Sequence, residues 1–221
     1  MKRKVLFASL GPALALGVLM VACGPKEGIA RKRPPGEFRE GDVLFQHFDS
    51  RLCRMIRDVT GSQLTHCGLV VHRDGKPFVL EAKSPAVRFV HLDQWFVQGW
   101  KGYYAHFRPR KISREQIGKV ALEAGRFLGR SYDLQYQLSD RKIYCSELVY
   151  KGFLRGARLE LGTPQKLGEL KWRPHETFIR ILAGGSLPLE RRIITPVAVA
   201  RSPHLRLLKS TFPKMTVSDG K

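Results

Sequence analysis

The stretch LTHCGLVVHRDGKPFVLEA, residues 64–82, decides the fold because it predicts two antiparallel strands joined by a tight turn. Two apolar, partly β-branched runs flank Asp74 and Gly75. An Asp-Gly pair between apolar runs is the strongest short-range signal of a β-hairpin. We therefore predict a domain built on an antiparallel sheet that contains this hairpin.

A two-residue turn in this hairpin also predicts which side chains share a face. It places Glu81 opposite Gly68, and because side chains alternate along a strand, Gly68 lies on the same face as His66. Glu81 is then diagonal to His66, at about 7 Å between backbone positions, within reach of a carboxylate–imidazole hydrogen bond. Cys67 points to the opposite face. This placement depends on the register, because a three-residue turn would move Glu81 to the wrong side.

A second stretch, KIYCSELVYKGF at residues 142–153, predicts a buried helix that begins at Cys145. Its apolar residues recur at the spacing of a helix face packed on a core. A thiol in the first turn of a helix meets unpaired backbone N–H groups and the positive end of the helix dipole, which lower its pKa. His66 and Glu81 would supply a base and its orienting carboxylate. Spacing alone leaves nucleophile and inert core residue as open alternatives for Cys145.

Metal binding and disulfide formation are the other uses that cysteines serve. The sequence has no CxxC, HxxxH or HExxH spacing, so it gives little support to a structural zinc site. If the cysteine at position 23 is lipidated, the thiols of Cys53, Cys67 and Cys145 remain. Their number is odd, so at least one of them is free or pairs between molecules.

The N-terminal residues 1–22 have the layout of a secretory signal peptide, with a basic start, an apolar stretch and a small residue before Cys23. The sequence MVAC that ends at Cys23 is similar to a bacterial lipobox, in which the cysteine is lipidated and becomes the new N-terminus. An uncleaved anchor and ordinary signal cleavage are the alternatives. We expect residues 23–39, rich in Gly, Pro and charge, to form a lipidated tether. Residues 40–215 then form the domain and residues 216–221 a flexible tail.

The charge of the chain is strongly basic, with 39 Lys and Arg against 19 Asp and Glu, a formal net charge of +20. Such a charge favours an anionic partner. An exported protein has little reason to meet nucleic acid, so we expect it to bind an anionic membrane surface instead. We accordingly predict an exported, membrane-anchored lipoprotein that faces the periplasm or the cell exterior.

Shorter patterns predict the remaining elements. Strands are expected at residues 42–46, 88–91, 103–108 and 192–200, and helices at residues 50–59 and from the capping box of Ser113 and Gln116 to Gly129. An aromatic cluster of Trp95, Phe96 and Trp100 is expected to cover the core. The sequence shows no internal repeat and no second domain.

Five short motifs follow one another in an order that resembles a known family. They are GDVLFQ (41–46), THCGLVV (65–71), VLEA (79–82), GRSYD (129–133) and YCSELVY (144–150). Together they resemble the YiiX-type permuted papain-like hydrolases of the wider NlpC superfamily, over residues 40–205. The resemblance implies an α/β (α+β) domain with a circularly permuted papain-like fold. In that fold an antiparallel sheet that carries the histidine precedes the cysteine helix and packs against helices.

The resemblance also implies roles for single residues. Cys145 would be the nucleophile, His66 the base and Glu81 the polar third member, the same three residues that the hairpin and the helix indicate. Gln46 and Tyr132 lie in matching motifs and would line the substrate site, although Tyr132 is also explained by packing. No metal and no organic cofactor is implied.

Two questions stay open at this level. Cys67 replaces a residue that is often apolar in its motif, so it fills the core or, if the helix at residues 50–59 packs behind the hairpin, bridges to Cys53. The expected activity is that of a thiol-dependent hydrolase (an amidase or peptidase) on amide or ester bonds of cell-envelope peptides. The alternatives are a lipid acyl hydrolase or acyltransferase at an anionic membrane, and a non-catalytic envelope-binding module. A polar groove would favour the first substrate class, and a deep apolar slot with a basic rim would favour lipids.

Overall fold

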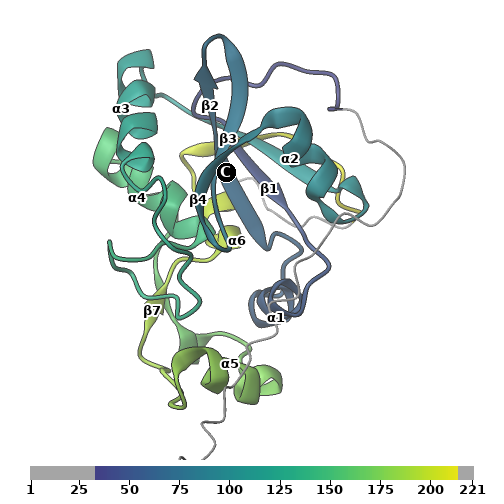
Figure 1. Ribbon diagram of the computed structural model, residues 1–221, viewed down its shortest axis with the longest axis vertical. Helices are drawn as coiled ribbons and strands as arrows, with labels where there is room; N and C mark the ends of the chain where they lie inside the picture. Colours follow the sequence, from purple (N-terminus) through teal and green to yellow (C-terminus); the bar gives the residue numbers. More distant parts are fainter. Residues whose placement is uncertain (1–32, 214–221) are drawn as a thin grey trace, which may run out of the picture.

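The computed structural model describes residues 33–213 (Figure 1). The predicted signal peptide, the lipidation site at Cys23 and the tail at residues 216–221 lie outside the described residues, as does most of the tether. Within residues 33–213, none of the helices combines the length and the apolar composition that a membrane crossing requires.

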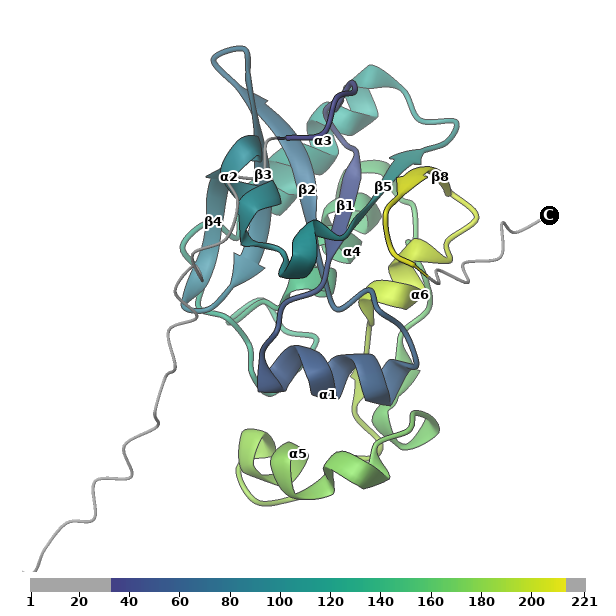
Figure 2. The same ribbon diagram turned by 90° about the vertical axis from the view of Figure 1, so that its right-hand side faces the viewer.

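A six-stranded sheet forms the centre of the structure (Figure 2). Its strands, in spatial order, are β4 (Ala86–His91), β3 (Lys76–Lys83), β2 (His66–Arg73), β1 (Val43–Gln46), β5 (Tyr104–Pro109) and β8 (Leu205–Ser210). Every pair of neighbouring strands is antiparallel. The predictions of an antiparallel sheet and of its strands at residues 42–46, 88–91 and 103–108 are therefore confirmed, with small shifts at the strand ends.

The hairpin of β2 and β3 has the register that the Asp-Gly turn predicts. Arg73 pairs with Lys76, which leaves Asp74 and Gly75 as the two turn residues. Their φ angles are 50° and 72°. Positive φ at both positions is what a type I′ turn requires, and Gly and Asp adopt it more readily than other residues. The register brings Glu81 to the predicted face of the sheet.

Two helices cover one face of the sheet, α3 (Arg114–Gly125) and α4 (Cys145–Ala157) (Figure 1). The capping box of α3 is present as predicted, but the helix ends at Gly125, before Gly129. The two helices approach closely at Gly156 of α4, where a Cβ atom would lie 2.4 Å from the backbone nitrogen of Val120. The predicted buried helix that begins at Cys145 is confirmed.

The other face of the sheet is covered by α2 (Leu92–Gln98) and the short 3-10 helix η1 (Trp100–Gly102). Trp95 and Phe96 are buried against this face, whereas Trp100 is 36% exposed. The prediction that the aromatic cluster covers the core is therefore confirmed for Trp95 and Phe96 but not for Trp100. This face also carries His66 and Glu81, which makes α2 a neighbour of the candidate site.

A smaller lobe, which we call the lower lobe, lies beyond one end of the sheet (Figure 2). It consists of α1 (Arg51–Thr60), β6 (Gln165–Lys166), η2 (Leu167–Glu169), η3 (Arg173–His175), α5 (Glu176–Ala183) and β7 (Arg192–Ile193). Ser50 caps the start of α1, and Gly61, with φ of 63°, ends it, which confirms the helix predicted at residues 50–59. Ile56 and Val59 of α1 share an apolar cluster with Ile179 of α5.

The strand predicted at residues 192–200 is wrong. Only Arg192–Ile193 forms a strand, β7, and Pro196–Ala200 forms the helix α6. The Thr195 side chain accepts a hydrogen bond from the N–H of Ala198, and Pro196 occupies the first helical turn. A threonine N-cap followed by proline is a strong helix start, and it outweighs the β propensity of the valines that follow.

Candidate active site

Cys145 is buried at the start of α4, where the backbone around it is fixed by the chain that follows β7. The N–H of Ile194 donates to the hydroxyl of Tyr144 at 2.9 Å. The hydroxyl of Ser146 donates to the carbonyl of Ile194 at 2.8 Å. Both neighbours of Cys145 are therefore tied to one residue, which holds the first turn of α4 in place.

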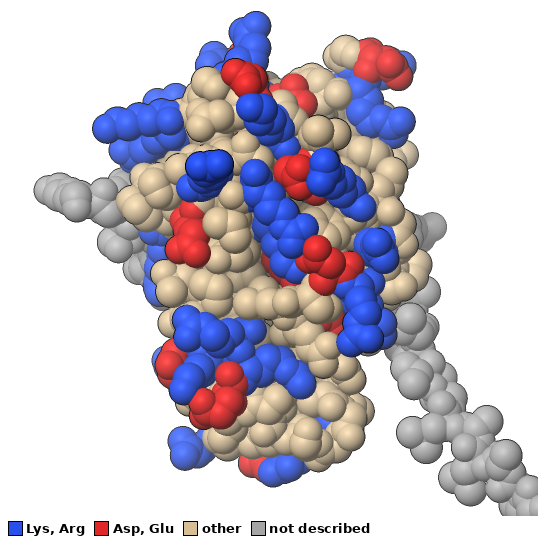
Figure 3. Space-filling view, turned by 90° about the vertical axis from the view of Figure 1, so that its left-hand side faces the viewer, with Lys and Arg blue, Asp and Glu red and all other residues tan. Residues whose placement is uncertain are grey.

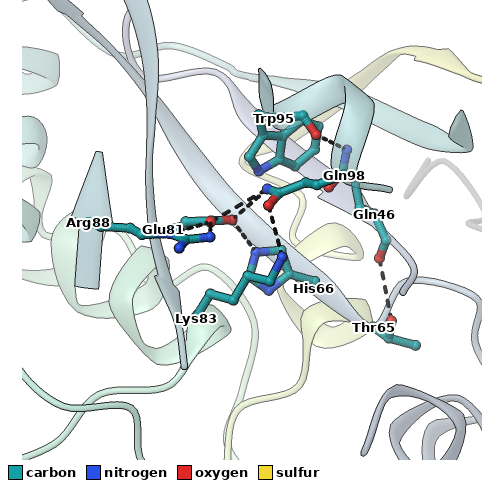
Figure 4. A network of polar contacts seen from close by, with 8 residues as sticks. All are labelled: Gln46, Thr65, His66, Glu81, Lys83, Arg88, Trp95 and Gln98. Carbon is teal, nitrogen blue, oxygen red and sulfur yellow. Dashed lines mark hydrogen bonds and ion pairs between the residues drawn. The ribbon is translucent and has the colours of Figure 1, made fainter. Parts of the chain in front are cut away.

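His66 is the first residue of β2, and its Nε2 lies 2.7 Å from Oε2 of Glu81 (Figure 4). The structure thus forms the contact that the hairpin register predicts. An ionised carboxylate only accepts hydrogen bonds, so Nε2 carries the proton in this bond. The other ring nitrogen, Nδ1, is left to exchange a proton with a thiol.

The pKa values of His66 and Cys145 shift toward an ion pair. Burial lowers the pKa of His66, but hydrogen bonds to Cys145 and Glu81 outweigh burial and raise it to about 9. Hydrogen bonds from Cys67 and His66 hold the pKa of the Cys145 thiol well below its ordinary value, against the effect of burial. Both shifts favour a thiolate beside an imidazolium, the form in which a cysteine attacks a carbonyl.

Cys67 contacts Cys145 from the position after His66 on β2. Its side chain points to the face opposite His66, as predicted, and there meets α4, where both its thiol and its backbone N–H hydrogen-bond to Cys145. Burial and the adjacent Cys145 raise the pKa of Cys67 well above its ordinary value. Cys67 therefore stays a protonated thiol, which donates to the Cys145 thiolate.

The disulfide between Cys53 and Cys67, one of the two alternatives for Cys67, is not formed. Cys53, Cys67 and Cys145 are all free thiols. The reason is geometric. The thiol of Cys67 faces Cys145, whereas the thiol of Cys53, on α1, hydrogen-bonds to Ser50 and Thr65.

Glu81 is fully buried and contacts two further side chains that the sequence patterns did not indicate. Arg88, its cross-strand partner on β4, donates to Oε1 at 3.0 and 3.1 Å. Gln98 donates to Oε2 at 3.2 Å and to Oε1 at 3.5 Å. Burial raises the pKa of Glu81, but the contact with His66 and the charges of Lys83 and Arg88 bring it down to about 2. The carboxylate is therefore ionised throughout the physiological pH range.

An aromatic ring packs against the imidazole. The ring centroid of Phe48 lies 5.0 Å from that of His66. The ammonium group of Lys83 lies 3.9 Å from the centroid of Phe48 on the same part of the sheet. Phe48 therefore limits the movement of the His66 ring, and a cation–π contact holds Phe48 in turn.

Gln46 lies opposite His66 in the register of β1 and β2, but its side chain is fully buried. Its Nε2 donates to the backbone carbonyl of Trp95 at 2.8 Å (Figure 4). This bond ties α2 to β1. Whether Gln46 also lines the substrate site stays a prediction.

Tyr132 and a second tyrosine, Tyr136, lie close to Cys145. Their hydroxyl oxygens are 3.4 Å apart. Burial is the main cause that raises the pKa of both phenols, and the negative charge of Cys145 adds to it. Tyr136 lines the pocket described below together with Cys145. Sequence patterns did not indicate it, because the polar stretch around it shows no periodicity.

An apolar pocket opens onto Cys145 from the lower lobe, with an empty volume of about 690 Å³ that includes its open mouth. Apolar side chains from α1, η2, α5 and β7 form a large part of its wall, among them Met55, Ile56, Leu167, Ile179, Leu182 and Ile193. Arg191 is the charged residue in the lining. The candidate nucleophile therefore borders a cavity suited to an apolar group.

Comparison with known proteins identifies the family. Residues 37–209 match the model of the permuted papain-like amidase enzymes of the YaeF/YiiX type, the C92 family. The chain belongs to this family. It is 34% identical over 176 residues to the uncharacterized protein YiiX of Escherichia coli (strain K12), covering 78% of this chain and 87% of that protein. A crystal structure of YiiX from Escherichia coli O157:H7, described as a metalloprotein, matches with a TM-score of 0.75 and 34% identity over 79% of this chain and 98% of that chain.

Membership of the permuted papain-like amidase family confirms the predicted fold. The strand that carries His66 precedes the helix that carries Cys145 along the chain, as the permuted order requires. The family also supports a thiol hydrolase of the amidase kind. The structure brings Cys145, His66 and Glu81 together. Cys67 contacts Cys145, and Gln98 contacts Glu81.

Proposed function

We propose that the chain hydrolyses an amide or ester bond through Cys145, His66 and Glu81. One observation carries this proposal, the hydrogen-bonded series that runs from Glu81 through His66 to Cys145 at the start of α4. Such a series supplies a nucleophile, a base and a group that orients the base. The membership of an amidase family supports the same reaction class.

The reaction has two halves. The Cys145 thiolate attacks the carbonyl carbon, and His66 gives its proton to the leaving amine or alcohol as the bond to it breaks. Backbone N–H groups in the first turn of α4 would hold the oxyanion. Water then attacks the thioester, His66 takes up the proton of that water, and the thiolate leaves as the acid is released.

The pocket favours a substrate with an apolar acyl chain over a polar peptide. Its wall is largely apolar, with many of the apolar side chains supplied by the lower lobe, and it borders Cys145 directly. A peptidoglycan stem peptide would offer such a wall little apolar surface. The pocket therefore best supports a lipid acyl hydrolase, or an acyltransferase that passes the acyl group to an acceptor other than water. An amidase that acts on envelope peptides is the second candidate.

A series of acyl substrates tests this choice. We expect kcat/KM of the full chain to rise with acyl length, by up to about fourfold per added CH₂ until the pocket is filled. Leu182→Trp, which fills the pocket from α5, should shorten the preferred chain, whereas Ile181→Trp, at a neighbouring position that is 65% exposed, should not. Equal rates for all chain lengths, together with turnover of stem peptides, would instead support the peptide amidase.

The crystallised YiiX of Escherichia coli O157:H7 is described as a metalloprotein. In the part of this chain that the structure describes, no three His, Cys, Asp or Glu side chains are grouped in a way that would hold a metal ion. The described residues therefore do not form a metal site, and no step of the proposed reaction passes through one.

We also propose that the chain works at an anionic membrane surface, anchored by a lipid on Cys23. Lys and Arg outnumber Asp and Glu in the chain, and blue side chains are more prominent than red ones on the face that carries α3 and α4 (Figure 3). Each basic residue near an anionic bilayer contributes about 1 kcal/mol of attraction. We expect the Cys23→Ser chain to sediment with phosphatidylglycerol vesicles at low salt and to be released by high salt. Equal sedimentation with phosphatidylcholine vesicles would contradict this.

A further inference from the structure

The carboxylate of Glu81 accepts hydrogen bonds from three side chains, of which one is neutral. His66 and Gln98 both donate to Oε2, at 2.7 and 3.2 Å, while Arg88 donates to Oε1. The side chain of Arg88 is 42% exposed, whereas Glu81 is fully buried. Arg88 therefore supplies charge from the solvent side. Gln98 is the neutral donor, which lies closer to the oxygen that His66 contacts and also reaches the other oxygen at 3.5 Å.

The orientation of the Gln98 amide is fixed by Lys83. The ammonium of Lys83 donates to Oε1 of Gln98 at 2.8 Å (Figure 4). An ammonium group has no acceptor, so the oxygen of the amide must face Lys83 and its NH₂ group must face Glu81. This removes the usual ambiguity between the two ends of a glutamine side chain.

Gln98 is placed for this contact by its position at the end of α2. It is the last residue of the helix, half-buried, and Gly99 follows it in extended conformation. A Cβ atom at Gly99 would lie 2.9 Å from Nε2 of Gln46, so this turn passes close to β1. The packing of the aromatic side chains of α2 on the sheet thus places the Gln98 amide beside the Glu81 carboxylate.

Building on the proposed function, we propose that Gln98 is a positioning residue of this site, which holds the Glu81 carboxylate in the orientation that receives His66. Lys83 aims the amide, the amide fixes the carboxylate, and the carboxylate fixes the imidazole that faces Cys145. Groups that orient a catalytic base in this way act without touching the substrate.

The substitution Gln98→Glu tests whether the hydrogen bond that residue 98 donates to Glu81 matters, because the new carboxyl group can donate only while it is protonated. While the new carboxyl group is protonated, its O–H donates to Glu81 and its other oxygen accepts from Lys83, as the amide does. Once ionised it only accepts, and it repels Glu81, since two close carboxylates do not both ionise easily. We expect the ratio of Gln98→Glu to wild-type kcat/KM to fall by about tenfold as pH rises from 5 to 8.

Gln94→Glu is the matched control, because Gln94 is exposed on the same helix one turn earlier. Its ratio to wild type should stay constant with pH. A constant ratio for Gln98→Glu, whether near one or uniformly low, overturns the positioning role. The first result would mean that the bond is dispensable, and the second that Gln98 only supports the fold.

A second measurement separates this inference from the proposed activity. In the Cys145→Ala chain, NMR follows the His66 ring proton that is bonded to Glu81, which needs no turnover. We expect Gln98→Glu to shift this resonance with pH over the same range, and Gln94→Glu to leave it unchanged. A chain that hydrolyses nothing but shows the shift would refute the hydrolase and keep the positioning role. An unshifted resonance overturns that role even if the enzyme is active.

Discussion

Replacing Cys145 with alanine is expected to abolish turnover, with a loss in kcat of at least about 10⁴-fold. In the proposed reaction the Cys145 thiolate forms the covalent bond to the acyl group. No other described thiol would take its place, because Cys53 and Cys67 have raised pKa values. The measurement compares the full chain and Cys145→Ala on the substrates of the acyl series. In the wild type, mass spectrometry should also find the acyl group on Cys145.

The matched control for this loss is Cys53→Ala. Cys53 is also buried and free, but it lies on α1 and takes no part in the proposed reaction. This variant should keep most of the activity. If Cys145→Ala turned over any of the acyl or peptide substrates at the wild-type rate, Cys145 would not be the nucleophile.

Replacing Glu81 with glutamine is expected to lower kcat/KM by about 10³–10⁴-fold. The change keeps the shape of the side chain but removes the charge that favours protonated His66. The raised pKa of His66, about 9, preserves the imidazolium below that pH, and the imidazolium in turn favours the Cys145 thiolate. In Glu81→Gln the imidazolium is lost at lower pH, so the thiolate needs a higher pH to form.

Alkylation of Cys145 by iodoacetamide measures this shift without a substrate. In the wild type we expect labelling at pH 6 to be at least about tenfold faster than that of free cysteine, whose thiol is then mostly protonated. In Glu81→Gln the rate at pH 6 should fall toward that of free cysteine. Identical pH profiles for the two chains would show that Glu81 does not act through His66.

The sequence predicted the hairpin and the cysteine helix well because each depends on local patterns. Asp74 and Gly75 fix a two-residue turn, the turn fixes the register, and the register alone brings Glu81 beside His66. The start of α4 at Cys145 follows from helical spacing in the same way. These features needed no knowledge of distant contacts.

The features that the sequence did not predict depend on elements that meet only in three dimensions. Gln98 reaches Glu81 because α2 packs on the sheet, and Cys67 meets Cys145 because α4 starts beside β2. The apolar pocket requires α1 and α5 to face each other. At residues 192–200 the β propensity of the branched residues predicted a strand. Thr195 and the proline after it instead start a helix.

The pocket wall and the reacting groups belong to separate parts of the chain. His66, Glu81 and Cys145 lie on the sheet and on the helix packed against it, while the lower lobe supplies much of the apolar pocket wall. If the proposed function holds, exchange of side chains on α5 alters which acyl groups enter the pocket and leaves His66, Glu81 and Cys145 unchanged. Such a division would let related enzymes keep one reaction and differ in substrate specificity. It makes α5 the first element to change when the substrate specificity is to be altered.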